Sequence, residues 1–327
     1  MWRKITLLLS LATFSLASTL IQPVSGEEYP TRPIELLCSY SPGSSVDIAA
    51  RIVAEVAPKY LRQPMVVVSK LGAGGSIAAA DVVSSKPDGY KLTQQSQAYF
   101  ATTTKTQKLL FDPTLLTPIA NIYQLKVGLL VKGDSPWKSL ADLLDFAKKN
   151  PGKLRWTHTG RGVPPHLAGM SIFRKAGVIT IDVPYKGTPE AIAAILGGHA
   201  DAYSGPYGAV KEQHRAGLVK YLVFYATKRY SEPSEVPCAL ELGFSDAAKL
   251  RVLFGVYAHK NTPEKVKKTL IDAFKKIYED PQFKKEMEKL GDELIYGDPE
   301  FLMKAIEESE EAGVPILKEL GLYKEQK

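Results

Sequence analysis

Short apolar runs alternate with helical spacing along the chain, and the first alternation is the clearest. Ile34 to Cys38 is an apolar run that predicts a buried strand, and the small polar residues from Ser41 to Ser45 indicate a tight turn. From Val46 onward the apolar residues recur at helical spacing. This stretch therefore predicts a strand that passes through a tight turn into a helix.

The predicted turn has the chemistry of an anion site. It leaves backbone N–H groups and the positive end of a helix dipole pointing outward, which suits a negative charge. The hydroxyl groups of Ser44 and Ser45 can bind a carboxylate or cap the helix. We interpret the turn as a grip for a small carboxylate, although the same residues are equally compatible with a purely structural joint. Asp47 is expected to cap backbone N–H groups rather than to contact a ligand.

The same alternation continues to the end of the chain. Further strands are predicted at residues 65–68, 90–95, 119–123, 127–131, 154–157, 179–183, 222–225 and 252–258. Further helices are predicted at residues 77–84, 139–149, 164–175, 190–196, 263–279, 281–290 and 299–312, the last three each with Pro at the first helical position. Alternating strands and helices with short turns predict mainly parallel sheets flanked by helices. We expect the chain to cross into a second lobe near residues 126–130.

A second polar turn, at residues 158–163, repeats the opening architecture in the second lobe. Arg161 lies there between two glycines, and its guanidinium can pair with a carboxylate in bidentate fashion. An exposed rim residue is the alternative. His158 and His166 flank the turn, but no third ligand lies nearby in the sequence, so no metal is predicted. His166 is expected to pack near the helix start with a hydrogen bond to the backbone.

Other polar residues stand at predicted strand ends. Ser96 and Gln97 end the strand at 90–95, and the carboxyl ends of strands line the ligand crevice of an α/β sheet. A surface loop is the competing interpretation. Tyr185 and Lys186 can line the same cleft, or only shape the turn before the next helix.

The signatures of common enzymes and of nucleic-acid binding are missing from the sequence. Gly72 to Gly75 follows the second strand without the G-x-G-x-x-G spacing of a dinucleotide site. No G-x-S-x-G elbow and no nucleophile–base arrangement is evident. The net charge is +7, but the basic residues are mixed with Glu on late helices and form no stripe with aromatic residues. We therefore predict no cofactor, no catalysis and no nucleic-acid partner.

The N-terminus and the cysteines bear on the compartment. Arg3 and Lys4 precede an apolar run, and small residues end at Gly26, as in a secretory signal peptide over residues 1–26. An uncleaved anchor is the alternative. Export predicts a periplasmic protein. Cys38 and Cys238 form no C-x-x-C pair, and we expect Cys38 to be a free buried thiol rather than half of a disulfide.

An ordered set of short motifs resembles one family, the extracytoplasmic solute-binding receptors of the tripartite tricarboxylate transporter type, also called the Bug or TctC family. The set covers essentially the whole chain after the signal peptide. It comprises Tyr29–Ile34, Pro42–Asp47, Ala50–Arg51, Gln63–Pro64, Val66–Val68, Gly72–Gly75, Pro87–Tyr90, Gly160–Gly162, His166–Leu167, Val183–Gly187, Leu196–His199, Asp201, Asn261–Pro263, Asp280–Pro281, Leu290–Gly291 and Asp298–Phe301.

This resemblance implies a two-lobed periplasmic binding protein fold, a Venus flytrap of type II-like form. Lobe 1 would be residues 27–128 and 252–327, and lobe 2 residues 129–251, with hinge bending near 126–130 and 248–254. A small carboxylate would be held between the lobes and delivered to membrane permease subunits by a monomeric receptor. A ligand-binding subunit of a membrane sensor kinase is an alternative, and a secreted enzyme a weaker one. The expected ligand-binding residues are Tyr40, Ser41, Pro42, Gly43, Ser44, Ser45, Asp47, Ser96, Gln97, Thr159, Gly160, Arg161, Gly162, His166, Tyr185, Lys186 and Asp201.

Three departures from the family pattern bear on the ligand. Ser44 stands where the family usually has a second glycine, and Asp182 stands where it often has His. Residues 163–165 read Val-Pro-Pro where small polar residues are usual, which removes two backbone donors. The sequence leaves dicarboxylates, aromatic acids, amino acids and nicotinate-like compounds open as ligands.

Overall fold

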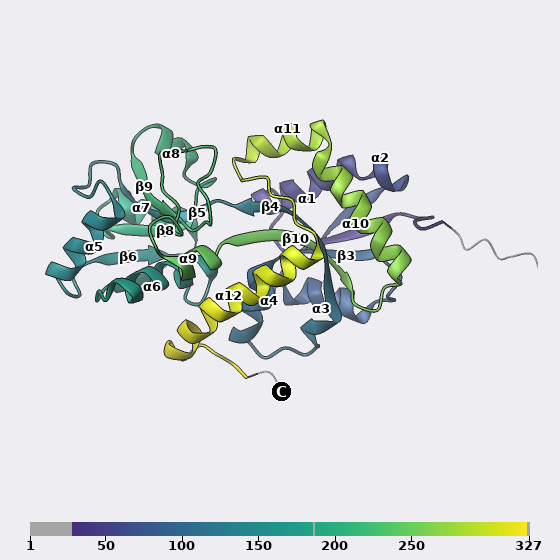
Figure 1. Cartoon of the computed structure of the whole chain (residues 1–327), viewed down its shortest axis with the longest axis horizontal. Helices are drawn as coiled ribbons and strands as arrows, with labels where there is room; N and C mark the ends of the chain where they lie inside the picture. Colours follow the sequence, from purple (N-terminus) through teal and green to yellow (C-terminus); the bar gives the residue numbers. More distant parts are fainter. Residues whose placement is uncertain (1–27, 186, 326–327) are drawn as a thin grey trace, which may run out of the picture.

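The computed structural model describes residues 28–185 and 187–325, which form two α/β lobes lying side by side (Figure 1). Lobe 1 is built on a sheet with the strand order β2 (Met65–Ser69), β1 (Ile34–Cys38), β3 (Lys91–Ser96), β10 (Val252–His259) and β4 (Leu116–Leu125). Lobe 2 is built on a sheet with the order β7 (Ile181–Pro184), β6 (Arg155–His158), β8 (Ala202–Pro206), β5 (Val127–Lys132) and β9 (Val219–Phe224).

One strand in each sheet, β10 or β5, runs antiparallel to both of its neighbours. The other pairings, β1 with β2 and β3, and β6 with β7 and β8, are parallel. The prediction of mainly parallel sheets is thus confirmed, with one reversed strand in each. Both reversed strands are interior, and β10 is buried along its whole length.

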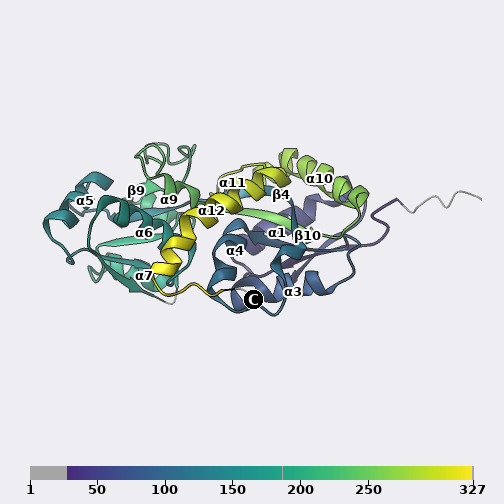
Figure 2. The same cartoon turned by 60° about the horizontal axis from the view of Figure 1, so that its bottom comes forward.

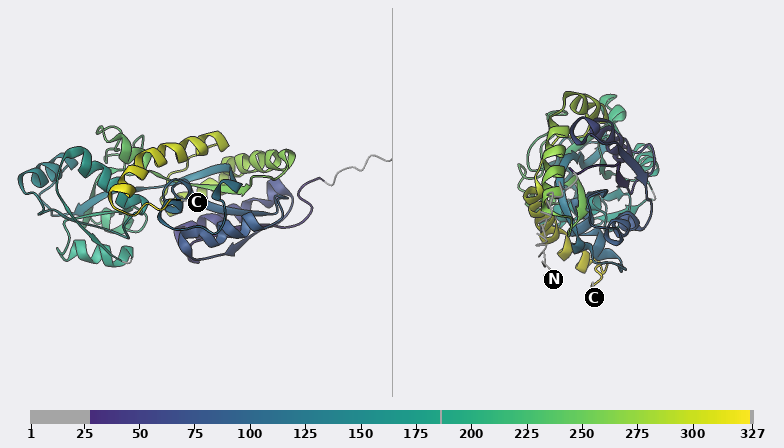
Figure 3. Two further views of the ribbon diagram at one scale, coloured as in Figure 1. Left: turned by 90° about the horizontal axis from the view of Figure 1, so that it is seen from below. Right: turned by 90° about the vertical axis from the view of Figure 1, so that its right-hand side faces the viewer.

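Helices flank each sheet, so both lobes have the layered form expected of alternating strands and helices (Figures 2 and 3). The α-helices of lobe 1 are α1 (Ser45–Val56), α2 (Pro58–Leu61), α3 (Ser76–Ser84), α4 (Gln97–Ala101), α10 (Glu264–Glu279) and α11 (Pro281–Leu290). Short 3-10 turns lie at Ala73–Gly75, Thr103–Thr106 and Pro113–Leu115. Lobe 2 contains α5 (Leu140–Lys149), α6 (Pro164–Ala176), α7 (Thr188–Leu196), α8 (Lys211–Arg215) and α9 (Ser245–Lys249).

The final helix, α12 (Pro299–Glu319), lies across both lobes (Figure 1). It packs against α4 and β4 in lobe 1 and against α6 and α9 in lobe 2. Gly313 permits this close packing, because a Cβ atom there would lie 2.6 Å from a methyl group of Thr102. The sequence pattern predicted that this helix ends at residue 312, but the helix continues past Pro315. Ile316 and Leu317, which follow this proline, are buried. Burial of these apolar side chains offsets the hydrogen bond that proline removes.

The chain passes from the first sheet to the second between β4 and β5, and Lys126 at this crossing is only 4% exposed. Its Nζ atom donates a hydrogen bond of 2.7 Å to the Glu232 carbonyl oxygen and lies 3.4 Å from a Glu293 carboxylate oxygen. Its backbone N–H donates to Asp292 Oδ1 at 3.3 Å. The crossing is therefore fixed by a buried polar network rather than by apolar packing alone.

Several elements differ from the sequence expectations. The short helices α2, α4, α8 and α9 and the strand β8 were not predicted. In β8, Gly205 and Pro206 weaken the apolar signal. Pro263 is the N-cap residue that precedes α10, whereas the sequence predicted it at the first helical position. Cys38 and Cys238 are both buried and unbonded, which confirms the free thiol expected at Cys38.

The N-terminal prediction lies beyond what the structure describes. The expected signal peptide, residues 1–26, falls outside the described residues. Among the helices of the described part of the chain, none is both long enough and apolar enough to cross a bilayer.

Asp292 predicts a pH effect at the lobe crossing. Burial raises the pKa of its carboxyl group to about 7, against the opposing effect of the Lys126 amide and ammonium, and Oδ2 has no hydrogen-bond partner within the described chain. Because this pKa is above its unfolded value, stability is lost as the pH rises from ~4 to ~7. Asp292→Asn still accepts from the Lys126 amide but cannot ionise. At about pH 8 the variant should melt ~2–6 °C higher than the wild type in calorimetry. The difference in melting temperature between the variant and the wild type should vanish near pH ~4. An equal difference at both pH values would contradict the role of Asp292 ionisation.

Candidate functional site

The loop that joins β1 to α1 carries the anion-site features predicted from the sequence. Ser44 is the N-cap of α1, with extended backbone angles, and its Oγ accepts from the Asp47 amide at 3.3 Å. Ser45 and Val46 therefore occupy the first two helical positions, where no intrahelical acceptor exists for their N–H groups. Residues 41–43 are exposed next to them. Within the described chain the amides of half-buried Ser45 and buried Val46 thus have no intrahelical partner, and they lie at the positive end of a 12-residue helix.

Asp47 holds this loop in shape. Its carboxylate accepts from the Gly43 amide at 2.9 Å and from Arg51 Nε and Nη2 at 2.9 and 3.1 Å. The bond from Arg51, with help from the Gly43 amide, lowers the pKa of Asp47 against the effect of burial. Because Asp47 is only 1% exposed and both of its oxygens are engaged, its contacts are those of a loop-shaping residue.

The residues predicted at the ends of lobe 1 strands have internal partners. Tyr40 packs edge-on against the Phe254 ring, and Ser96 caps α4 by accepting from the Tyr99 amide at 3.2 Å. Gln97 is fully buried. Its amide donates to the Arg251 carbonyl oxygen and to Ser309 Oγ, and accepts from the Leu253 amide. Both N–H bonds of Gln97 are thus used to fasten α4 to β10 and α12, not directed at a ligand.

The loop that joins β6 to α6 in lobe 2 differs from its lobe 1 counterpart at the start of the helix and at its glycines. Pro164 and Pro165 fill the first two helical positions and have no N–H groups. The Gly160 amide donates to His158 Nδ1 at 3.1 Å, and the Gly162 amide donates to His166 Nδ1 at 3.1 Å. The two helical positions that correspond to Ser45 and Val46 therefore have no N–H groups, and the two glycine amides of the loop are bonded to histidine rings.

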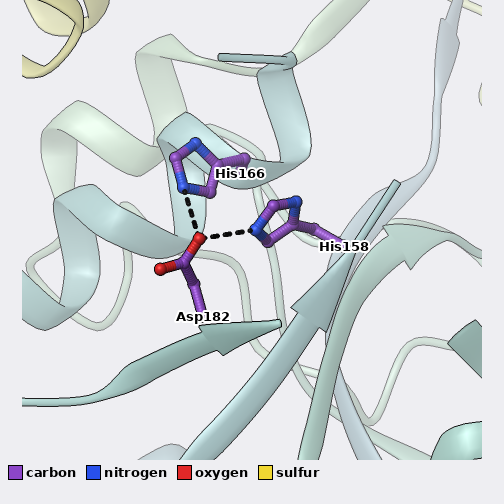
Figure 4. A group of neighbouring side chains, drawn as sticks. All are labelled: His158, His166 and Asp182. Atoms are coloured by element: carbon purple, nitrogen blue, oxygen red, sulfur yellow. Dashed lines mark hydrogen bonds and ion pairs between the residues drawn. The ribbon is translucent and has the colours of Figure 1, made fainter. Parts of the chain in front are cut away.

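Asp182, from the neighbouring strand β7, is the centre of the side-chain cluster at this loop (Figure 4). His158 Nε2 lies 3.3 Å and His166 Nε2 3.8 Å from Asp182 Oδ2. Arg161 Nε and Nη2 donate to the two carboxylate oxygens at 2.8 and 3.0 Å. Both histidine rings are fully buried, and the Trp156 ring stacks on His166.

The cluster is electrically neutral near neutral pH. Burial lowers the pKa of His158, and burial together with the nearby His158 lowers the pKa of His166 to about 4. Burial alone would raise the pKa of Asp182, but the hydrogen bonds from Arg161 and His158 outweigh it and hold that pKa below its usual value. One arginine cation, one aspartate anion and two neutral rings therefore face one another.

The three side chains have the composition of a metal site but the wrong hydrogen bonding. One ligand atom from each of His158, His166 and Asp182 lies within 4.8 Å of the others. Each histidine Nδ1 accepts a backbone N–H, so the proton of each neutral ring sits on Nε2, the atom that faces Asp182. A metal-bound histidine instead donates its remote N–H to an acceptor. The residues do not fit a resident metal ion, although the sequence argument that no third ligand lies nearby was wrong, because β7 brings in Asp182.

Other predicted residues lie apart from this cluster or next to it. Asp201 binds Arg155 Nε and Nη2 at 3.2 and 3.0 Å, and Arg155 is the first residue of β6 whereas His158 is the last. Asp201 therefore lies at the amino-terminal end of β6, whereas the cluster lies at its carboxyl end. Tyr185 joins the cluster through its amide, which donates to the His158 carbonyl oxygen. Thr159 is half-buried in the loop, and Lys186 lies outside the described residues.

Two members of the cluster, His158 and Asp182, were absent from the expected ligand-binding set. A signal did exist, since Asp182 is an acidic residue in an otherwise apolar four-residue strand. Strand neighbours cannot be read from one sequence, so its proximity to the loop at 158–163 was not predictable.

The comparisons with known proteins settle the family. A family model described as the tripartite tricarboxylate transporter family receptor matches residues 49–322. The chain belongs to this receptor family. A UPF0065 protein from the gbd 5' region of Cupriavidus necator is 34% identical over 303 residues, which covers 92% of this chain and 91% of that protein. The sequence-based assignment to the TctC receptors is thereby confirmed.

Solved structures confirm the two-lobed periplasmic binding protein fold of the receptor. A TctC solute-binding protein from Polaromonas superposes with a TM-score of 0.79 at 27% identity, covering 89% of this chain and 99% of that one. MatC from Rhodopseudomonas palustris, solved with bound malate, superposes with a TM-score of 0.67 at 25% identity, covering 87% of this chain and 99% of that one.

His166 should make the receptor sensitive to acid. Its folded pKa of about 4 is below the unfolded value, so its contribution to stability is present above pH ~6.5 and lost as the pH falls toward ~4. His166→Asn keeps an acceptor near the Gly162 amide but cannot titrate. Between about pH 7 and pH 4.5 the wild type should therefore lose more of its melting temperature than the variant. Asp292 gains stability as the pH falls over this range, but it does so equally in both proteins. The readout is therefore the difference between the two curves of melting temperature against pH. Parallel curves would refute the role of His166.

Proposed function

We propose that the receptor captures a small carboxylate between the loop at residues 41–47 of lobe 1 and the loop at residues 159–166 of lobe 2. The open N-terminus of α1, with its two free amides, carries this proposal. Both loops follow the carboxyl ends of parallel strands, where ligands of open α/β sheets bind. The bound malate of the related MatC supports a carboxylate as the class of ligand.

The proposed receptor closes on its ligand by bending at the crossings between the lobes, near residues 126–130 and 248–254. We take residues 27–128 and 252–327 as lobe 1 and 129–251 as lobe 2, with the difference that the first two residues of β5, Val127 and Gly128, belong to the lobe 2 sheet. A signal peptide cleaved near Gly26 would deliver the receptor as a periplasmic monomer, and the permease subunits of a tripartite tricarboxylate-type transporter would receive the ligand unchanged. Membership of the receptor family and the periplasmic binding fold support this assignment.

A proline substitution tests whether the first amide of α1 binds the ligand. Ser45→Pro removes one N–H and one hydroxyl at the first helical position, where proline is tolerated, and the extended backbone of Ser44 suits a following proline. Ser45→Ala is the matched control, since it removes only the hydroxyl. Loss of a hydrogen bond to a charged group should raise the dissociation constant by ~10–100-fold in Ser45→Pro and by clearly less in Ser45→Ala.

The measurement is calorimetry with a panel of carboxylates, after a thermal-shift screen has selected the tightest binder. Nuclear magnetic resonance of the recovered ligand should show it unaltered, and X-ray scattering should show a smaller radius when the ligand is bound. Equal affinity of the two Ser45 variants would remove α1 from the binding site. A chemically changed ligand would replace the receptor proposal with an enzyme.

A further inference from the structure

Arg161 is the exposed cation of the lobe 2 loop, yet its charge is already neutralised. Its side chain is 55% exposed, and both Nε and Nη2 are bonded to the Asp182 carboxylate. This is the planar bidentate geometry that gives arginine its strongest carboxylate contacts. A ligand carboxylate that sought the same face of the guanidinium would have to displace Asp182.

Asp182 is itself held firmly in place. His158 supports the carboxylate from the buried side, and the Gly160 amide fixes the His158 ring through Nδ1. Asp182 remains 24% exposed, so its negative charge also faces the solvent side of the loop. A second negative group arriving there would meet repulsion from Asp182, and among the described residues of the lobe 2 loop the one cation, Arg161, is already paired.

The two proposed halves of the ligand site therefore differ in their electrostatics. Lobe 1 offers two free amides at a helix N-terminus to one carboxylate. Among the described residues of the lobe 2 loop, Arg161 is paired, Pro164 and Pro165 have no N–H, and the Gly160 and Gly162 amides are bonded to histidines.

We infer, on the basis of the proposed function, that Asp182 makes the receptor select solutes with a single carboxylate. The carboxylate binds the amides of lobe 1, and the distal end of the solute is uncharged or carries a hydrogen-bond donor. Asp182 is a specificity-determining residue because it occupies Arg161 and repels a second carboxylate. Monocarboxylates and zwitterions are thus the ligand class, in preference to dicarboxylates.

The test compares matched pairs of acids by calorimetry: butyrate with succinate, pentanoate with glutarate, and hexanoate with adipate. In the wild type the monocarboxylate of the best-binding pair should bind more tightly. Asp182→Asn should shift the ratio of affinities toward the dicarboxylate by about tenfold or more, since the substitution frees Arg161. The gain should disappear in the double variant Asp182→Asn with Arg161→Gln.

Asp201→Asn is the control, because it frees a comparably paired arginine at the amino-terminal end of β6. Its affinity ratio should equal that of the wild type. Tighter binding of dicarboxylates by the wild type, or an unchanged ratio in Asp182→Asn, would overturn the inference while leaving the receptor proposal intact. Failure of these acids and of every carboxylate in the thermal-shift screen to bind would instead refute the proposed function, and the inference with it.

Discussion

Two backbone hydrogen bonds determine the chemistry of the lobe 2 loop. The amides of Gly160 and Gly162 donate to Nδ1 of His158 and His166, which places the ring protons on the Nε2 atoms that face Asp182. The Asp182 carboxylate accepts hydrogen bonds from Arg161 and from His158 Nε2, and these bonds hold its pKa below the usual value, whereas His166 Nε2 lies 3.8 Å away without a hydrogen-bond partner among the described residues. The two backbone bonds exclude the histidine tautomer that a metal needs. A local backbone arrangement thus decides which groups remain free to meet a ligand.

The two lobes show how one architecture can present different surfaces. Each places a strand, a polar turn and a helix N-terminus in succession, and both turns contain glycine. In lobe 1 the serine cap leaves two amides open at the start of α1. In lobe 2 two prolines start α6, and the glycine amides turn back to histidine rings. The similarity of fold therefore does not extend to the electrostatics, which are those of a helix N-terminus in one lobe and of a neutral ion pair in the other.

Much of the fold was predictable because its signals are local. The apolar run at Ile34–Cys38 and the helical spacing after Ser44 identified β1 and α1 almost to the residue. The strand β8 was missed because Gly205 and Pro206 interrupt its apolar pattern, and the full length of α12 was missed because a proline normally ends a helix. The predicted serine loop carries free donors, whereas the pairing of Arg161 with Asp182 depends on strand adjacency, which no local pattern encodes. Gln97 and Asp201 were expected at the ligand for their position and motif, but their hydrogen bonds tie them to other parts of the fold.

The account depends most on the free amides at the start of α1, and nuclear magnetic resonance can observe them directly. An isotope-labelled receptor would be titrated with the carboxylate that raises its melting temperature most. The account predicts that the amide proton of Ser45 or Val46 moves downfield on binding, as expected for a new bond to a carboxylate, while the Gly160 and Gly162 amides keep their histidine partners. Binding that leaves both lobe 1 amide protons unmoved would contradict the central claim.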